Sequence, residues 1–298
     1  MNSKHIIFVP GKNPKPQAEQ HRELLWRALL EGVHRADAST ADAMRPVREQ
    51  FHLVSWNYLY YQEYKDISRE LPWIDALINQ HGPTPKDIAE AISWNYRKNR
   101  LILKIVDHLP ALIRFLPEEA RSTEIEIKRY FSNGDNIAQD IRKLLKDQLR
   151  SLLKKGDQVL LVGHSLGSVI AYDSLWELTH EEGLDGKVDL LTIGSPLGMH
   201  YVRRHLLGLK GTNHKSYPGM IRRWINVASE GDVTALERNL SDSFKAMREQ
   251  GLVDSIEDHC KGIYNYFRND EGLNCHRSYG YLVNPAVGIV IANWWKQR

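Results

Sequence analysis

The chain has 298 residues, of which 42% are hydrophobic and 26% are charged, a balance typical of a folded globular protein rather than a disordered or fibrous one. Its formal net charge is only +3, and basic residues are mixed with acidic ones, which argues against a nucleic-acid-binding protein. No stretch is long and apolar enough to cross a bilayer, and the run Ile6–Val9 is too short for a signal-peptide core. We therefore expect a cytoplasmic protein.

The N-terminal segment alternates strand and helix patterns. The run Ile6–Val9 predicts a buried strand that ends at Pro10-Gly11. Apolar residues at helical spacing predict a helix over residues 17–34, and Phe51–Trp56 predicts a second strand.

Residues 57–132 have a different composition. They are rich in aromatic residues and contain an apolar stretch, Leu101–Leu116, broken at Pro110. Because no linker composition borders this segment, we expect a mostly helical insertion, or cap, within a single domain over residues 1–298. The aromatics at 56–64 either line an acyl or aryl pocket or pack between cap and sheet. Charged residues interrupt Leu101–Leu116, which favours packing over contact with a membrane or a second subunit.

The C-terminal half repeats the alternation of strands and helices. The expected elements are a helix over 133–155, a strand over 158–162, a helix from about 167, strands over 188–193 and 221–227, and a closing helix at Asn284-Pro285. Such alternation predicts an α/β fold with a mainly parallel sheet covered by helices on both faces.

The strongest motif is Gly163-His164-Ser165-Leu166-Gly167, between an apolar strand and a helix. This is the context of a nucleophile elbow, in which a serine on a tight turn projects its hydroxyl above the sheet. The glycines are required because strand and helix approach closely at such a turn. His164 is expected to pack inside the turn, because it cannot easily face the hydroxyl of its neighbour.

Together with Gly194-Ser195-Pro196-Leu197 and Val9-Pro10-Gly11, this elbow resembles the α/β-hydrolase superfamily, and within it the lipase- and esterase-like members. The resemblance covers nearly the whole chain except the insertion at 57–132. It implies an α/β-hydrolase fold and a catalytic triad in the chain order serine, acid, histidine.

A serine needs a base to take its proton and an acid to orient that base. The family places the acid after a later strand, and here Asp232 follows the strand at 221–227, with Glu230 as its competitor. The resemblance places the histidine before the final helix, which favours His276 over His259, the latter expected on or near a helix.

The resemblance assigns the backbone donors of an oxyanion hole to Leu166, directly after the nucleophile, and to Lys12, after Gly11. Many family members have histidine where this chain has Pro10, so Asn13 stays an alternative donor. Lys12 and Lys15 are either exposed loop lysines or groups that attract an anionic substrate.

The resulting hypothesis is a serine hydrolase that cleaves a carboxylic ester, with lipid and other acyl esters as candidate substrates, through an acyl-enzyme on Ser165, with no cofactor or metal. Thioester hydrolysis and acyl transfer use the same machinery, and a non-catalytic binding protein is the alternative outside enzymes. The expected partner is a small ester or acyl substrate; peripheral membrane contact is not favoured, and the oligomeric state is open. The two cysteines, Cys260 and Cys275, lack CxxC spacing, so we expect free thiols.

Overall fold

The structure is a computed structural model that describes residues 3–108, 126–209 and 211–297. Its centre is a six-stranded sheet in the order β2-β1-β3-β4-β5-β6, and all neighbouring strands run parallel. The strands are β1 (Lys4–Val9), β2 (Phe51–Leu53), β3 (Gln158–His164), β4 (Val188–Ile193), β5 (Ile221–Val227) and β6 (Ser255–His259). A separate antiparallel pair joins β7 (Arg268–Asn269) and β8 (Gly272–Leu273).

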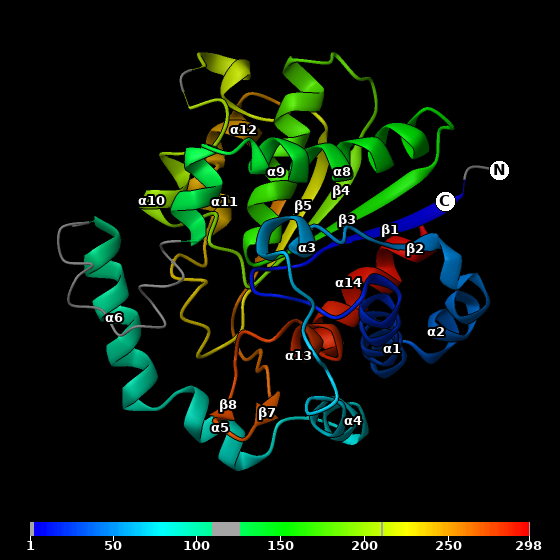
Figure 1. Ribbon diagram of the computed structural model, residues 1–298, viewed down its shortest axis with the longest axis vertical. Helices are drawn as coiled ribbons and strands as arrows, with labels where there is room; N and C mark the ends of the chain where they lie inside the picture. The colour runs from blue at the N-terminus through cyan, green and yellow to red at the C-terminus, as the bar shows by residue number, and fades with distance from the viewer. Residues whose placement is uncertain (1–2, 109–125, 210, 298) are drawn as a thin grey trace.

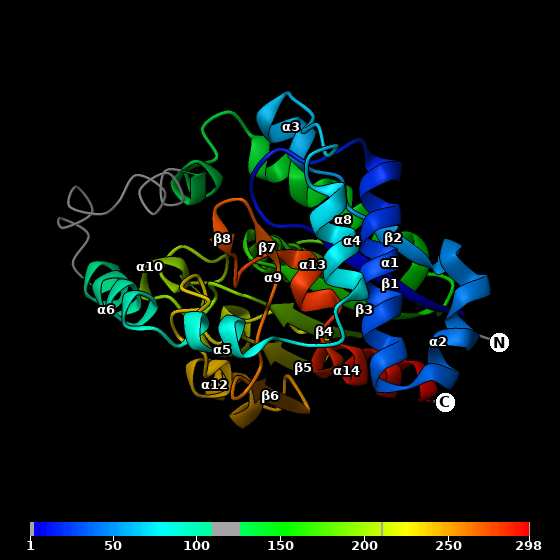
Figure 2. The same cartoon turned by 90° about the horizontal axis from the view of Figure 1, so that it is seen from below.

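Helices cover both faces of the sheet (Figure 1; Figure 2), which confirms the predicted α/β class. On one face lie α1 (Ala18–Ala36), α2 (Ala38–Met44), α13 (Ser278–Leu282) and α14 (Pro285–Lys296). On the other lie α3 (Asn57–Tyr61), α8 (Ile137–Leu153), α9 (Leu166–His180), α10 (His200–Arg203), α11 (Leu240–Ser243) and α12 (Lys245–Glu249). Two short 3₁₀ helices span Arg45–Gln50 and Asn213–Ser216.

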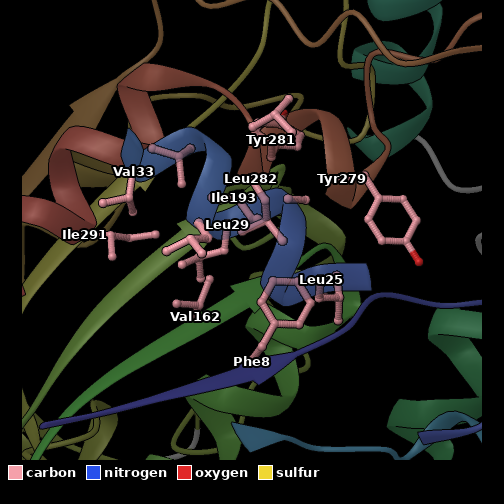
Figure 3. Packing of buried hydrophobic residues seen from close by; sticks show 14 of the residues in the cluster. Phe8, Leu25, Leu29, Val33, Val162, Ile193, Tyr279, Tyr281, Leu282 and Ile291 are labelled. Carbon is pink, nitrogen blue, oxygen red and sulfur yellow. The ribbon is translucent and has the colours of Figure 1, made fainter. Parts of the chain in front are cut away.

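Alternation along the strands divides the core into two layers. Ile6 and Phe8 of β1 face α1, α13 and α14, whereas Ile7 and Val9 face α8 and α9. Successive side chains of a strand point to opposite faces, so a strand that is apolar throughout can be buried on both sides. Figure 3 shows the first layer, in which Phe8 and Val162 of the sheet lie opposite Leu29 of α1 and Ile291 of α14.

The predicted strands and helices are present, but several of their bounds differ, and β6 was not predicted from the sequence. Strands 188–193 and 221–227 have the expected bounds, whereas β3 continues to His164. The second strand ends at Leu53 rather than Trp56, because the chain turns into α3 after the Val54 amide donates to the Phe8 carbonyl (3.0 Å). Placing His259 on or near a helix was wrong, since it is the last residue of β6, an edge strand paired with β5.

The insertion at 57–132 is mostly helical where the structure describes it. Its elements are α3, α4 (Leu71–Asn79), α5 (Pro85–Ala91), α6 (Trp94–His108) and helical residues 126–132. Residues 109–116 of the apolar stretch, including Pro110, lie outside the described residues. None of the helices in the described ranges is long and apolar enough to cross a membrane. Both cysteines, Cys260 and Cys275, are free thiols.

Helices α1 and α14 cross in close contact at two glycines. A Cβ atom on Gly288 would lie 1.9 Å from the Gly32 carbonyl oxygen, and one on Gly32 would lie 1.9 Å from the Leu282 carbonyl oxygen. Both distances are far below van der Waals contact, and the opposing atoms are backbone, so a side chain would force the helices apart. The absence of side chains here brings α14 and α13 close to α1.

We predict that Gly288→Ala lowers the free energy of unfolding by about 1–3 kcal/mol, because overpacking outweighs the helix propensity of alanine. Gly82→Ala is the matched control, since a Cβ there would meet no atom within 4 Å. Urea unfolding of both variants measures the difference. Equal midpoints for the two variants would show that the helix crossing tolerates a methyl group.

Candidate active site

Ser165 lies on the turn between β3 and α9, at the carboxyl edge of the sheet. Its backbone has φ 54° and ψ −128°, a region that non-glycine residues rarely adopt and that costs about 1–3 kcal/mol. The turn is held by the Ser165 amide, which donates to the Ile193 carbonyl (3.1 Å), and by the Ser168 amide and hydroxyl, which donate to the Ser165 carbonyl (2.9 and 2.6 Å). This is the geometry expected of a nucleophile elbow.

Close backbone contacts explain the glycines of the motif. A Cβ on Gly163 would lie 2.6 Å from the Ser168 Cα, and one on Gly167 would lie 2.1 Å from the Val9 carbonyl oxygen. Gly11 is equally constrained, because a Cβ there would lie 2.8 Å from the Ser165 Cβ. Strand β3, helix α9 and the loop after β1 can therefore meet only where side chains are absent.

The structure brings Ser165, His276 and Asp232 into one hydrogen-bonded line. His276 Nε2 lies 2.9 Å from Ser165 Oγ, and His276 Nδ1 lies 2.9 Å from Asp232 Oδ2. Asp232 follows β5, and His276 precedes α13. Because the Asp232 carboxylate accepts from Nδ1, the histidine presents Nε2 as an acceptor to the serine hydroxyl when it is neutral.

Asp232 is fully buried and holds its charge through hydrogen bonds. Burial by itself raises its pKa, but His276 and hydrogen bonds from His276, Tyr281 and the Thr234 amide outweigh that effect, so the pKa is lowered. The stability that this carboxylate contributes is therefore present above the pKa of the unfolded chain and is lost as the pH falls through the folded pKa. At neutral pH Asp232 is ionised.

His164 packs behind the site, as the sequence predicts. Its ring lies 4.8 Å from the His276 ring, and its Nε2 lies 2.8 Å from the His276 carbonyl oxygen. Burial, together with the neighbouring His276, holds the pKa of His164 well below 6.5, so the ring is neutral. Since a carbonyl only accepts, Nε2 carries the hydrogen, and His164 fixes the backbone of the residue that faces the serine.

Sequence analysis did not identify Tyr281, a fully buried residue of α13. Its hydroxyl donates to Asp232 Oδ2 (2.6 Å) and accepts from the Ser229 amide (2.9 Å). Because an amide can only donate, the tyrosine hydrogen is directed at the carboxylate. No local pattern around Tyr281 reveals this contact, which spans 49 residues of sequence.

The competing residues lie away from this line. The Glu230 carboxylate pairs with Arg238 (2.8 Å). His259 is part-exposed at the end of β6, where its Nε2 lies 3.9 Å from the Glu257 carboxylate. Neither has a hydrogen bond to Ser165 or His276 among the contacts of the described residues.

The predicted oxyanion donors lie on two segments, the start of α9 and the loop after β1. Leu166 is the first residue of α9, where backbone N–H groups have no partner within the helix. Lys12 lies in the loop after β1. The Asn13 amide, the alternative donor, donates to the Tyr61 hydroxyl (2.9 Å), so it is already engaged.

The loop lysines are only partly exposed. Lys12 Nζ lies 3.6 Å from the Glu126 carboxylate, and Lys15 Nζ donates to the Lys12 carbonyl (2.7 Å). Burial and the charges of Arg277 and Lys65 lower the pKa of Lys15 to about 7. Lys15 thus supports the loop from within, and its charge is only partly retained at neutral pH.

The aromatics at 56–64 divide between core and surface. Trp56 and Tyr60 are buried, whereas Tyr58 and Tyr64 are exposed and stack on each other with ring centroids 4.5 Å apart. Within the described ranges, no group of three or more His, Cys, Asp or Glu residues is placed to hold a metal ion.

Comparison with known proteins adds one finding to this geometry. A family model described as Lipase (class 3) matches residues 103–219. The chain has the α/β-hydrolase fold, and the matched segment is similar to a lipase family of that superfamily. The match supports a lipase- or esterase-like hydrolase in general. Comparison with curated proteins and with solved structures gave no match.

The matched part of this α/β hydrolase contains the elbow and α9 but ends before Asp232 and His276. The family match therefore bears on the serine, while the acid and the base rest on the geometry described above.

We predict that Tyr281→Phe slows labelling of Ser165 by a fluorophosphonate about tenfold, equivalent to about 1.4 kcal/mol. The carboxylate loses one donor and the Ser229 amide loses its acceptor, so the free energy of unfolding should also fall by about 1–3 kcal/mol. Tyr279→Phe is the matched control, because the hydroxyl of this neighbouring tyrosine makes no hydrogen bond within the described residues. Identical labelling rates for the two variants would exclude a role for the Tyr281 hydroxyl in orienting Asp232.

Proposed function

We propose that the chain hydrolyses a carboxylic ester through an acyl-enzyme formed on Ser165. The observation that carries the proposal is the line of two 2.9 Å contacts that joins Ser165 to His276 and His276 to Asp232. The strained backbone of the elbow supports it, because the protein maintains an unfavourable φ at the serine whose Oγ lies 2.9 Å from His276 Nε2. The match to class 3 lipases across this serine points to the same chemistry.

In the first half-reaction, Ser165 Oγ attacks the ester carbonyl carbon while its proton passes to His276 Nε2. The carbonyl oxygen becomes negatively charged and is stabilised by the amides of Leu166 and Lys12. The intermediate then collapses, the bond to the alcohol oxygen breaks, and the alcohol leaves with the proton from Nε2. The product is an acyl ester of Ser165.

In the second half-reaction, a water molecule gives its proton to His276 Nε2 and attacks the acyl carbon. Collapse of this second tetrahedral intermediate returns the proton to Ser165 Oγ and releases the carboxylic acid. Asp232 remains a carboxylate throughout and stabilises the positive charge that His276 carries in each intermediate. These steps use only groups of the chain, the ester and water.

The insertion at 57–132 is proposed to act as a cap that selects the ester. Its described helices are attached to the segments that carry the triad: the Tyr96 hydroxyl donates to the Leu273 carbonyl (2.7 Å), and Arg100 donates to the Leu236 carbonyl (2.8 Å). Leu273 lies three residues before His276 and Leu236 four after Asp232. A shift of α6 would therefore also move the segments that contain Leu236 and Leu273, which lie close in sequence to Asp232 and His276.

The proposal predicts that one fluorophosphonate adds to the purified protein and that Ser165→Ala abolishes the adduct, as measured by intact mass. Hydrolysis of p-nitrophenyl esters of two to twelve carbons should fall by about 10⁴-fold or more in Ser165→Ala, His276→Ala and Asp232→Asn, because the three groups act as a unit. Adding an alcohol and measuring free acid against the new ester separates hydrolysis from acyl transfer.

Matched controls use the competing residues. His259→Ala and Glu230→Gln remove the alternative base and acid, and both variants should retain labelling and turnover. A folded parent protein that neither reacts with the fluorophosphonate nor cleaves any ester would refute the hydrolase proposal and favour a binding role. Loss of activity in His259→Ala instead of His276→Ala would refute the assignment of the base.

A further inference from the structure

The loop after β1 is held by side chains at four consecutive carbonyl groups. Trp56 Nε1 donates to the Pro10 carbonyl (2.9 Å), and Asn57 Nδ2 donates to the carbonyls of Gly11 (2.8 Å) and Asn13 (2.9 Å). The fourth carbonyl, that of Lys12, accepts from Lys15 Nζ (2.7 Å). With these four carbonyls held, residues 10–13 have few alternative backbone conformations.

Fixing a carbonyl also fixes the direction of the next amide. In a trans peptide the C=O and the following N–H belong to one plane and point in opposite directions. Asn57, by holding the Gly11 carbonyl, therefore sets the direction of the Lys12 N–H. In the same way, Trp56 sets the direction of the Gly11 N–H through the Pro10 carbonyl.

The hydrogen bonds also distinguish the candidate oxyanion donors. The Asn13 amide is engaged by the Tyr61 hydroxyl, whereas the Lys12 amide makes no hydrogen bond within the described part of the chain. Gly11 lies against the nucleophile, since a Cβ on it would be 2.8 Å from the Ser165 Cβ. The unpaired Lys12 amide thus belongs to the peptide that directly follows the residue packed against Ser165.

Asn57 is suited to this task by its burial. Only 2% of the residue is exposed, and its Oδ1 has no hydrogen-bond partner among the described residues. Leaving a buried acceptor unpaired costs about 1–3 kcal/mol, so the amide is not placed here for its oxygen. Its two donors bridge the carbonyls on either side of Lys12.

We propose that Asn57 is a positioning residue for ester hydrolysis, which holds the Gly11 and Asn13 carbonyls and thereby directs the Lys12 N–H at the oxyanion. The inference rests on the proposed function, because an oxyanion hole has meaning only if Ser165 attacks a carbonyl. Under this proposal Asn57, the first residue of the insertion, supports the oxyanion hole and does not contribute to substrate selection by the cap.

The test is Asn57→Asp, which keeps the shape of the side chain and replaces its two donors by acceptors. We expect kcat for a p-nitrophenyl ester to fall roughly 100-fold with KM changed less than about threefold, because an oxyanion donor acts only in the transition state. Affinity for a trifluoromethyl ketone, whose adduct carries the same oxyanion, should fall in parallel with kcat/KM. Lowering the pH should recover part of the loss relative to the parent, since a protonated carboxyl regains one donor.

Asn79→Asp is the matched control, an exposed asparagine of α4 that receives the same change of charge. If Asn57→Asp fails to fold, as judged by circular dichroism and thermal melting, Asn57→Gln and Tyr61→Phe replace it. The first moves the donors by one methylene, and the second frees the Asn13 amide; both should lower kcat more than KM rises.

The outcomes separate this inference from the function on which it rests. If the parent cleaves esters and the folded Asn57 variants retain kcat, or raise KM alone, the positioning role is refuted and the hydrolase proposal stands. If the parent is inert to esters and fluorophosphonate alike, both are refuted.

Discussion

The close approach of three backbone segments around Ser165 is the constraint on which the site depends. Helix α9 begins so near the end of β1 that a Cβ on Gly167 would lie 2.1 Å from the Val9 carbonyl oxygen. This contact brings the start of α9 against the end of β1, and the Gly11 backbone of the following loop packs against Ser165. The strained φ of Ser165 is maintained because the surrounding hydrogen bonds and packing leave the chain no relaxed alternative.

The buried carboxylate of Asp232 must be surrounded by hydrogen-bond donors, and one of these donors connects the site to the hydrophobic core. A charge with no exposure is tolerated only when donors surround it, and one of those donors is Tyr281 on α13. The same short helix ends at Leu282, whose carbonyl contacts Gly32 of α1. The packing of α1 against α13 and α14 therefore positions the Tyr281 hydroxyl that donates to Asp232. A substitution that shifts these helices would move this hydroxyl relative to the carboxylate.

The sequence predicted best what depends on local pattern. The strand patterns at 188–193 and 221–227 predicted strands with the right bounds, and the G-x-S-x-G motif predicted the elbow. The strand β6 was missed because Ser255–His259 has mostly polar residues, as an edge strand with one partner permits. Asp232 and His276 were predicted by chain order from a family resemblance; the structure places them within hydrogen-bond distance, and their catalytic roles stay a prediction.

Residues that act only through the tertiary structure could not be predicted. Asn57 reaches Gly11 across 46 residues and Tyr281 reaches Asp232 across 49, and each lies in a segment whose composition indicates ordinary packing. The polar contacts of the aromatic residues at 56–64 were likewise not predictable from the sequence. The sequence offered a pocket lining or a cap core, whereas Trp56 and Tyr61 use their polar atoms to hold the loop after β1.

The insertion consequently consists of two parts under different constraints. Its first turn, at Asn57–Tyr61, is hydrogen-bonded together with the preceding Trp56 to the loop after β1, so under the proposed function substitutions there would act on the transition state. Farther along, α6 exposes Trp94, Leu101 and Ile105 and is attached to the body by a few polar contacts, such as Asp107 with the His200 amide (2.7 Å). Under the proposed function, α6 would select the ester while the first turn holds the loop after β1, so the two parts could vary independently and one set of reacting groups could be fitted to different esters.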